Sequence, residues 1–182
     1  TFKQGERYLI IGESGCGKTT LIHMLCGMRR YYQGTVLLDE REACNLTAND
    51  WASLRAQRLG LVFQDLRLFS DLTARENLSL LPVHDRERPK IEDMAEQLGM
   101  TAFLDRPCEH LSHGQRQRIA VMRVLCRPFE FLLLDEPFSA QNEDGRRRIE
   151  TLLEQECQAG RSVLLALHQT DSERETLTLT QN

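Results

Sequence analysis

One eight-residue segment constrains the fold more than any other part of this 182-residue chain. It has the pattern G-x-x-x-x-G-K-T and runs Gly12-Glu13-Ser14-Gly15-Cys16-Gly17-Lys18-Thr19. The apolar run Tyr8-Leu9-Ile10-Ile11 precedes it, and Leu21, Ile22, Leu25 and Met28 follow at the spacing of one helix face. A strand, a glycine-rich turn and a helix in this order predict a phosphate-binding loop.

The residue types of this loop suit a nucleoside triphosphate. Glycines let successive backbone N–H groups point at phosphate oxygens, beside the positive end of the following helix. Lys18 adds a charge for the β- and γ-phosphates, and Thr19 offers a hydroxyl to Mg²⁺. The predicted nucleotide-binding residues of this segment are Gly12, Glu13, Ser14, Gly15, Cys16, Gly17, Lys18, Thr19 and Thr20.

A second apolar run, Phe131-Leu132-Leu133-Leu134, leads into Asp135, Glu136 and Pro137. Ligands collect at the carboxyl ends of strands in α/β sheets, so Asp135 is predicted to hold Mg²⁺. Glu136 is one residue further along and is placed to polarise an attacking water. An apolar run ending in two carboxylates is a weak signal alone, but beside a phosphate-binding loop it becomes specific.

The apolar runs predict an α/β fold with a mostly parallel sheet. Further strand-like runs occur at 35–38, 61–63 and 163–167, and helical patterns alternate with them. Residues from about 65 to 110 differ, because they hold almost no strand-like run and carry a capping box at Thr73 and Glu76. We therefore expect one domain over 1–182, with a core of 1–64 and 111–182 and an inserted helical lobe of about 65–110.

Composition excludes several classes of protein. The net charge is −4 and the two signs are interspersed, so no nucleic-acid partner is expected. The apolar stretches fall short of the roughly 18 residues that span a bilayer, so any membrane role would come through a partner. The six cysteines are scattered without a C-x-x-C pair, which favours reduced thiols over a zinc site.

Four more segments resemble the motifs of one family, the nucleotide-binding domains of ATP-binding cassette (ABC) proteins. Leu111-Ser112-His113-Gly114-Gln115 is similar to the signature motif, and Ser139-Ala140-Gln141-Asn142 stands where the D-loop is expected. Gln64 resembles the Q-loop glutamine and His168 the switch histidine. With the phosphate-binding loop and Asp135-Glu136, they occur in family order along nearly the whole chain.

The resemblance implies a mechanism and partners. ATP and Mg²⁺ would bind at the loop, with Thr19, Gln64 and Asp135 as metal ligands and Glu136 as general base. Lys18 and His168 would stabilise developing charge, and Gln64 would report the nucleotide state. A second copy would pack head to tail, so that its Ser112, Gly114 and Gln115 reach the γ-phosphate. A separate transmembrane permease would hold the pair at the cytoplasmic face of the cell membrane.

Three departures from the family pattern stand out. His113 replaces a glycine of the signature motif, and Gln141-Asn142 replaces Leu-Asp, which removes a carboxylate from the D-loop. The family's adenine-stacking aromatic residue and its N-terminal antiparallel strands would lie upstream of Thr1. Ser112 also has a purely structural interpretation, as the N-cap of a helix with Gln115 completing a capping box.

The segments 54–65 and 72–77 look like the lipoprotein-releasing and macrolide-export group of ABC transporters. Two alternatives stay open beside transport. One is an ABC ATPase serving cell division, DNA repair or translation, and the other is a nucleotide-binding regulatory module with poor turnover. The altered D-loop at Gln141-Asn142 keeps the second alternative open.

Overall fold

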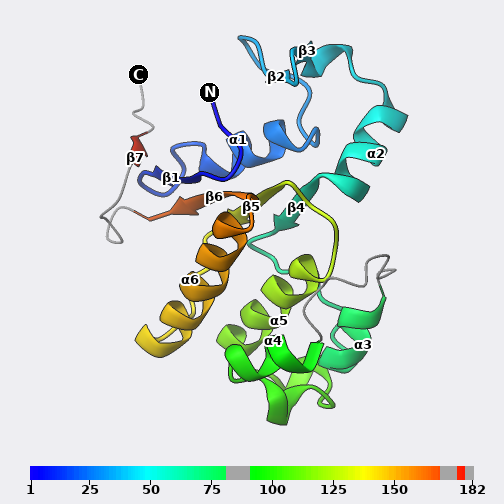
Figure 1. Ribbon diagram of the computed structural model, residues 1–182, viewed down its shortest axis with the longest axis vertical. Coiled ribbons are helices and arrows are strands. Elements are labelled where there is room, and N and C mark those ends of the chain that lie inside the picture. The colour runs from blue at the N-terminus through cyan, green and yellow to red at the C-terminus, as the bar shows by residue number, and fades with distance from the viewer. Residues whose placement is uncertain (81–90, 169–175, 179–182) are drawn as a thin grey trace.

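The computed structural model describes residues 1–80, 91–168 and 176–178. Its centre is a five-stranded sheet in which all pairings are parallel (Figure 1). The strand order is β4 (Leu59–Val62), β5 (Phe131–Asp135), β6 (Ser162–Leu167), β1 (Arg7–Ile11) and β7 (Thr176–Thr178). The predicted α/β fold with a mostly parallel sheet is confirmed.

The central strands are apolar at consecutive positions because both faces of the sheet are covered. On one face, Ile10, Leu133 and Leu164 pack with α1 (Lys18–Leu25) and α2 (Ala48–Gln57). On the other face, Leu9, Leu132 and Leu165 join the larger core, to which α5 (His113–Leu125) and α6 (Glu143–Gln158) contribute. In Figure 1, α1 lies above the sheet while α5 and α6 lie below it.

Short polar sequences fix where the helices begin. Thr47 and Asp50 form a capping box at the start of α2, and Ser112 and Gln115 form one at the start of α5. Asn142 caps α6 by accepting a hydrogen bond from the backbone N–H of Gly145 at 2.9 Å. The predicted capping box of Ser112 is confirmed.

The regular elements among the described residues between 65 and 110 are helices and 3₁₀ turns, and the other residues of this range form turns and loops. The helices are α3 (Ala74–Ser79) and α4 (Ile91–Gln97), and the 3₁₀ turns are Thr101–Phe103 and Cys108–His110. The capping box of Thr73 and Glu76 begins α3. Met94 and Leu98 are fully buried in the core cluster that also holds one face of the sheet. This segment is therefore packed continuously onto the core, and its definition as a separate lobe stays a prediction.

Two local expectations were wrong. The expected strand at 35–38 is only β2 (Leu37–Leu38), which pairs antiparallel with β3 (Arg41–Glu42) in a hairpin outside the main sheet. Asp39 and Glu40 both have positive φ, as the turn of such a hairpin requires. Met28 does not share the buried face of α1, because the helix ends at Leu25 and Met28 is 42% exposed.

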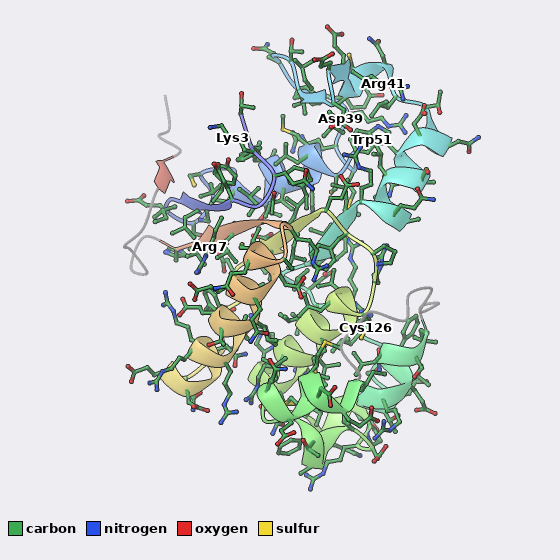
Figure 2. The ribbon with its side chains drawn as sticks, in the orientation of Figure 1. Lys3, Arg7, Asp39, Arg41, Trp51 and Cys126 are labelled. Atoms are coloured by element: carbon green, nitrogen blue, oxygen red, sulfur yellow. The ribbon has the colours of Figure 1, made fainter. Side chains whose placement is uncertain are left out.

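Gly27, just after the end of α1, lies against Trp51 of α2. A Cβ atom at Gly27 would lie 2.1 Å from Cδ2 of Trp51, so only glycine fits against the indole. Trp51 is 2% exposed and points from α2 toward the end of α1 (Figure 2).

All six cysteines are free thiols. Among the residues that the structure describes, no helix has the length and apolar content to cross a membrane.

Candidate functional site

The phosphate-binding loop joins β1 to α1 at the carboxyl edge of the sheet. Gly15 and Gly17 have φ angles of 82° and 102°, in the left-handed region that favours glycine. Gly17 occupies the N-cap of α1 and has no side chain with which to cap it. The loop therefore leaves the positive end of α1 available to an anion.

Lys18 is buried within this loop although it carries a charge. It is 5% exposed, and its Nζ donates hydrogen bonds to the carbonyl oxygens of Gly12 at 2.7 Å and Glu13 at 2.9 Å. These two carbonyls hold the ammonium group at the loop, where it can meet a phosphate oxygen. The contact of Lys18 with the β- and γ-phosphates stays a prediction.

A cavity of about 320 Å³ lies beside the loop and gathers the three predicted metal ligands. It is lined by Thr19, His23, Phe63, Gln64, Asp65, Arg67 and Asp135. Asp135 is 3% exposed, and its Oδ1 is buried without a hydrogen-bond partner among the described residues. A buried carboxylate oxygen without a partner is costly. The oxygens of Thr19, Gln64 and Asp135 are of the kind that Mg²⁺ prefers, so these residues fit that ion.

Glu136 and His168 follow neighbouring strands at the same edge of the sheet. Glu136 comes directly after β5 and has a φ angle of 50°, a strained conformation for a residue with a side chain. Its backbone N–H donates to the carbonyl oxygen of Ala166 on β6 at 3.0 Å. His168 comes directly after β6 and is exposed. Neither side chain lines the cavity around Asp135.

The structure does not bring the signature residues into this cavity. Ser112 accepts a hydrogen bond from the N–H of Gln115 at 3.2 Å, and Gln115 Oε1 accepts from the N–H of Ser112 at 2.8 Å. Ser112 and His113 are exposed, and α5 packs on the sheet face opposite to α1. Within one copy, the signature turn therefore does not line the cavity beside the phosphate-binding loop.

Comparison with known proteins decides the family. Residues 1–139 match the family described as ABC transporter. The chain belongs to the ABC transporter family. It has the α/β fold of that family's ATPase cassettes, and it is a transporter ATPase subunit.

Relatives of this ABC chain include import and export proteins. It is 35% identical over 171 residues to the thiamine import ATP-binding protein ThiQ of Histophilus somni, covering 91% of this chain and 77% of ThiQ. It is 31% identical over 173 residues to the macrolide export ATP-binding/permease protein MacB of Bartonella henselae. That alignment covers 92% of this chain but 26% of MacB, so the chain spans about a quarter of that relative.

Solved ABC cassettes share the fold. A dimeric post-hydrolysis state of the ATP-binding cassette MJ0796, bound to ADP and Pi, aligns with a TM-score of 0.78 and 29% identity. The alignment covers 92% of this chain and 76% of that one. The cassette CbiO1 of Clostridium perfringens, described as part of an ABC transporter complex, aligns with a TM-score of 0.72 and 26% identity over 92% of this chain and 69% of that one.

The sequence of this ABC cassette did not reveal four residues of the cavity wall, which are His23, Phe63, Asp65 and Arg67. His23 lies on α1 four residues after Thr19, a helical spacing that could have revealed it. Arg67 had no such signal, since its place depends on the positive φ angles of Leu66 and Arg67. The Arg67 guanidinium carbon lies 3.4 Å from the ring centroid of Phe63, so the wall combines a cation with an aromatic face.

Proposed function

We propose that the loop of residues 12–20 binds the triphosphate of ATP and that Thr19, Asp135 and Gln64 hold Mg²⁺ beside it. The observation that carries this proposal is the buried, unpartnered Oδ1 of Asp135 in a cavity that it shares with Thr19 and Gln64. Bound Mg²⁺ would neutralise charge on the phosphate oxygens. The backbone amides at the start of α1 and the ammonium group of Lys18 supply the remaining positive charge.

Glu136 acts as the general base in this proposal. Its carboxylate takes a proton from water as the water oxygen forms a bond to the γ-phosphorus. The bond between that phosphorus and the bridging oxygen of ADP breaks, which releases ADP and phosphate. His168 hydrogen-bonds the γ-phosphate and orients the water. The position of both residues just beyond β5 and β6 supports this pairing.

We further propose that a second copy completes the site. Ser112, Gly114 and Gln115 do not line the cavity of their own copy, and they stand at a helix start that suits an anion. A head-to-tail pair would bring that turn to the γ-phosphate held by the partner's loop. The dimeric state of the similar cassette MJ0796 supports such an assembly.

A transmembrane permease is the proposed membrane partner, and it would hold the chain at the cytoplasmic face of the cell membrane. The relatives ThiQ and MacB, named for thiamine import and macrolide export, support a transporter role. The lipoprotein-releasing and macrolide-export subgroup stays a prediction, since ThiQ matches with higher identity than MacB.

The test compares ATP turnover of the protein with that of Glu136→Gln, in the presence of Mg²⁺. Turnover should fall by about 10²- to 10⁴-fold, the usual contribution of a general base, while ATP binding persists. Glu154→Gln, an exposed change on α6, is the matched control and should keep wild-type turnover. Equal rates for Glu136→Gln and the wild-type protein would exclude Glu136 as the general base.

A further inference from the structure

Gln117 is a buried amide on the first turns of α5, and every part of its head group has a partner. The side chain is 2% exposed. Its Nε2 donates to the carbonyl oxygen of Glu136 at 2.9 Å and to Oγ of Ser139 at 3.2 Å. Its Oε1 accepts from the backbone N–H of Ala140 at 3.4 Å. A buried amide satisfied in this way is held in one orientation.

Glu136 needs such support because its backbone is strained. Residues with positive φ and a side chain persist only where their surroundings hold them. The N–H of Glu136 is tied to β6 through Ala166, and its carbonyl oxygen accepts from Gln117 Nε2 and, at 3.3 Å, from the N–H of Ser139. Among the described residues, Gln117 is the one side chain that hydrogen-bonds the carbonyl oxygen of Glu136, and it comes from a different element.

Gln141 fixes which way the Gln117 amide faces. Its Nε2 donates to Gln117 Oε1 at 2.9 Å and to the carbonyl oxygen of Gly114 at 2.8 Å. With a donor from Gln141 on one side, the oxygen of Gln117 faces that side and its NH₂ group faces Glu136. Gln141, which departs from the family pattern, therefore makes specific contacts with Gln117 and Gly114.

Two glycines make room for this arrangement. A Cβ atom at Gly114 would lie 2.5 Å from the carbonyl oxygen of Ala140, and one at Gly145 would lie 2.5 Å from Gln141 Oε1. A side chain at Gly114 would push the start of α5 away from the backbone of the segment 139–141, and a side chain at Gly145 would displace the amide of Gln141. The close approach lets the amides of Gln117 and Gln141 meet.

We propose that Gln117 is a positioning residue for Glu136 and that Gln141 sets the orientation of Gln117. This inference rests on the proposed role of Glu136 as general base. Gln117 does not touch the nucleotide; it holds the peptide group from which the carboxylate of Glu136 projects. The network also contains the carbonyl of Gly114, so the start of α5 and Glu136 are fixed to each other.

The test measures kcat and KM for ATP in Gln117→Glu and Gln141→Leu. The first change keeps the size of the side chain and the acceptor toward Gln141, but sets an oxygen against the carbonyl oxygen of Glu136. We expect kcat to fall by about 10- to 100-fold, as for a small misplacement of a catalytic group, with KM within about twofold of wild type. Gln155→Glu, an exposed change on α6, is the matched control.

A double-mutant comparison separates positioning from a merely structural role. With Glu136→Gln already present, Gln117→Glu should change the residual rate by less than about twofold, because residues acting as one unit are not additive. The inference would be overturned if Gln117→Glu lowered kcat by the same factor in the wild-type protein and in Glu136→Gln. It would also be overturned if both Gln117→Glu and Gln141→Leu kept the wild-type kcat. If Gln117→Glu does not fold, the half-buried Gln141→Leu carries the same comparison. Wild-type turnover in Glu136→Gln alone would instead overturn the proposed function.

Discussion

Arg123, near the end of α5, donates from Nη2 to the carbonyl oxygen of Leu66 at 2.8 Å and from Nη1 to that of Arg67 at 2.7 Å. Leu66 and Arg67 both have positive φ angles, 58° and 48°. Burial, and secondarily the charge of Arg127, lowers the pKa of the Arg123 guanidinium from its ordinary value. The loop that follows β4 and contains Gln64 is therefore held in a strained shape by one cation on α5.

Replacing this cation should destabilise the fold. Arg123→Leu leaves two carbonyl oxygens without their charged donor and releases the strained turn. We expect a loss of about 1.5–3 kcal/mol in the free energy of unfolding, the usual size for hydrogen bonds to charged groups. Urea unfolding measures it, with exposed Arg30→Leu as the control. Equal losses in the two variants would show that the contacts to Leu66 and Arg67 contribute nothing specific.

Gly27 and Gly34 form a matched pair for the packing of Trp51. Both have positive φ, but a Cβ atom at Gly34 would meet nothing within 4 Å, whereas one at Gly27 would clash with the indole. Gly34→Ala should cost about 1–2 kcal/mol from backbone strain alone. Gly27→Ala should cost about 1–3 kcal/mol more because of overpacking. Thermal unfolding midpoints of Gly27→Ala and Gly34→Ala measure this difference. Equal midpoints for the two variants would contradict a clash between a side chain at position 27 and Trp51.

The capping box of α3 should make stability depend on pH. The hydroxyl of Thr73, followed by its backbone N–H, lowers the pKa of Glu76 below its ordinary value of 4.5. A lowered pKa in the folded state adds stability above pH 4.5, and this stability is lost as the pH falls below that value. The stability of Glu76→Gln should therefore differ most from that of the wild-type protein at neutral pH.

Thermal unfolding midpoints from neutral pH down to about pH 3 measure this effect. The difference in unfolding midpoint between the wild-type protein and Glu76→Gln should become smaller as Glu76 becomes protonated. Glu96→Gln, an exposed change on α4, serves as the control and should show no such narrowing. A difference in midpoint that stays constant over the whole pH range would argue against a charged hydrogen bond at Thr73.

The local features of the fold could be predicted from sequence because their chemistry lies within a few residues. The glycine spacing of the loop, the run ending at Asp135 and the capping boxes of Thr73 and Ser112 are of this kind. The expected strand at 35–38 was too long, since an apolar run does not show whether a partner strand lies beside it.

Features that depend on tertiary packing could not be predicted in the same way. The positive φ of Leu66 and Arg67 has no glycine to mark it, and it is held by Arg123 from 56 residues further along. The contacts of Gln141 require the start of α5 at Gly114 to lie against the segment 139–141, although 27 residues separate Gln141 from Gly114. Sequence alone therefore gave Gln141 only as a departure from a pattern.

The central claim is that the loop around Lys18 and the turn at Ser112 hold one ATP between two copies. Sedimentation of Glu136→Gln with saturating ATP tests it most directly, because this variant should bind ATP without hydrolysing it. For Glu136→Gln we predict a particle of twice the single-chain mass in the presence of ATP and a particle of single-chain mass in its absence. Adding Ser112→Arg to this variant should abolish the pair while ATP binding remains. Pairing that survives Ser112→Arg, or a single chain at saturating ATP, would contradict the account.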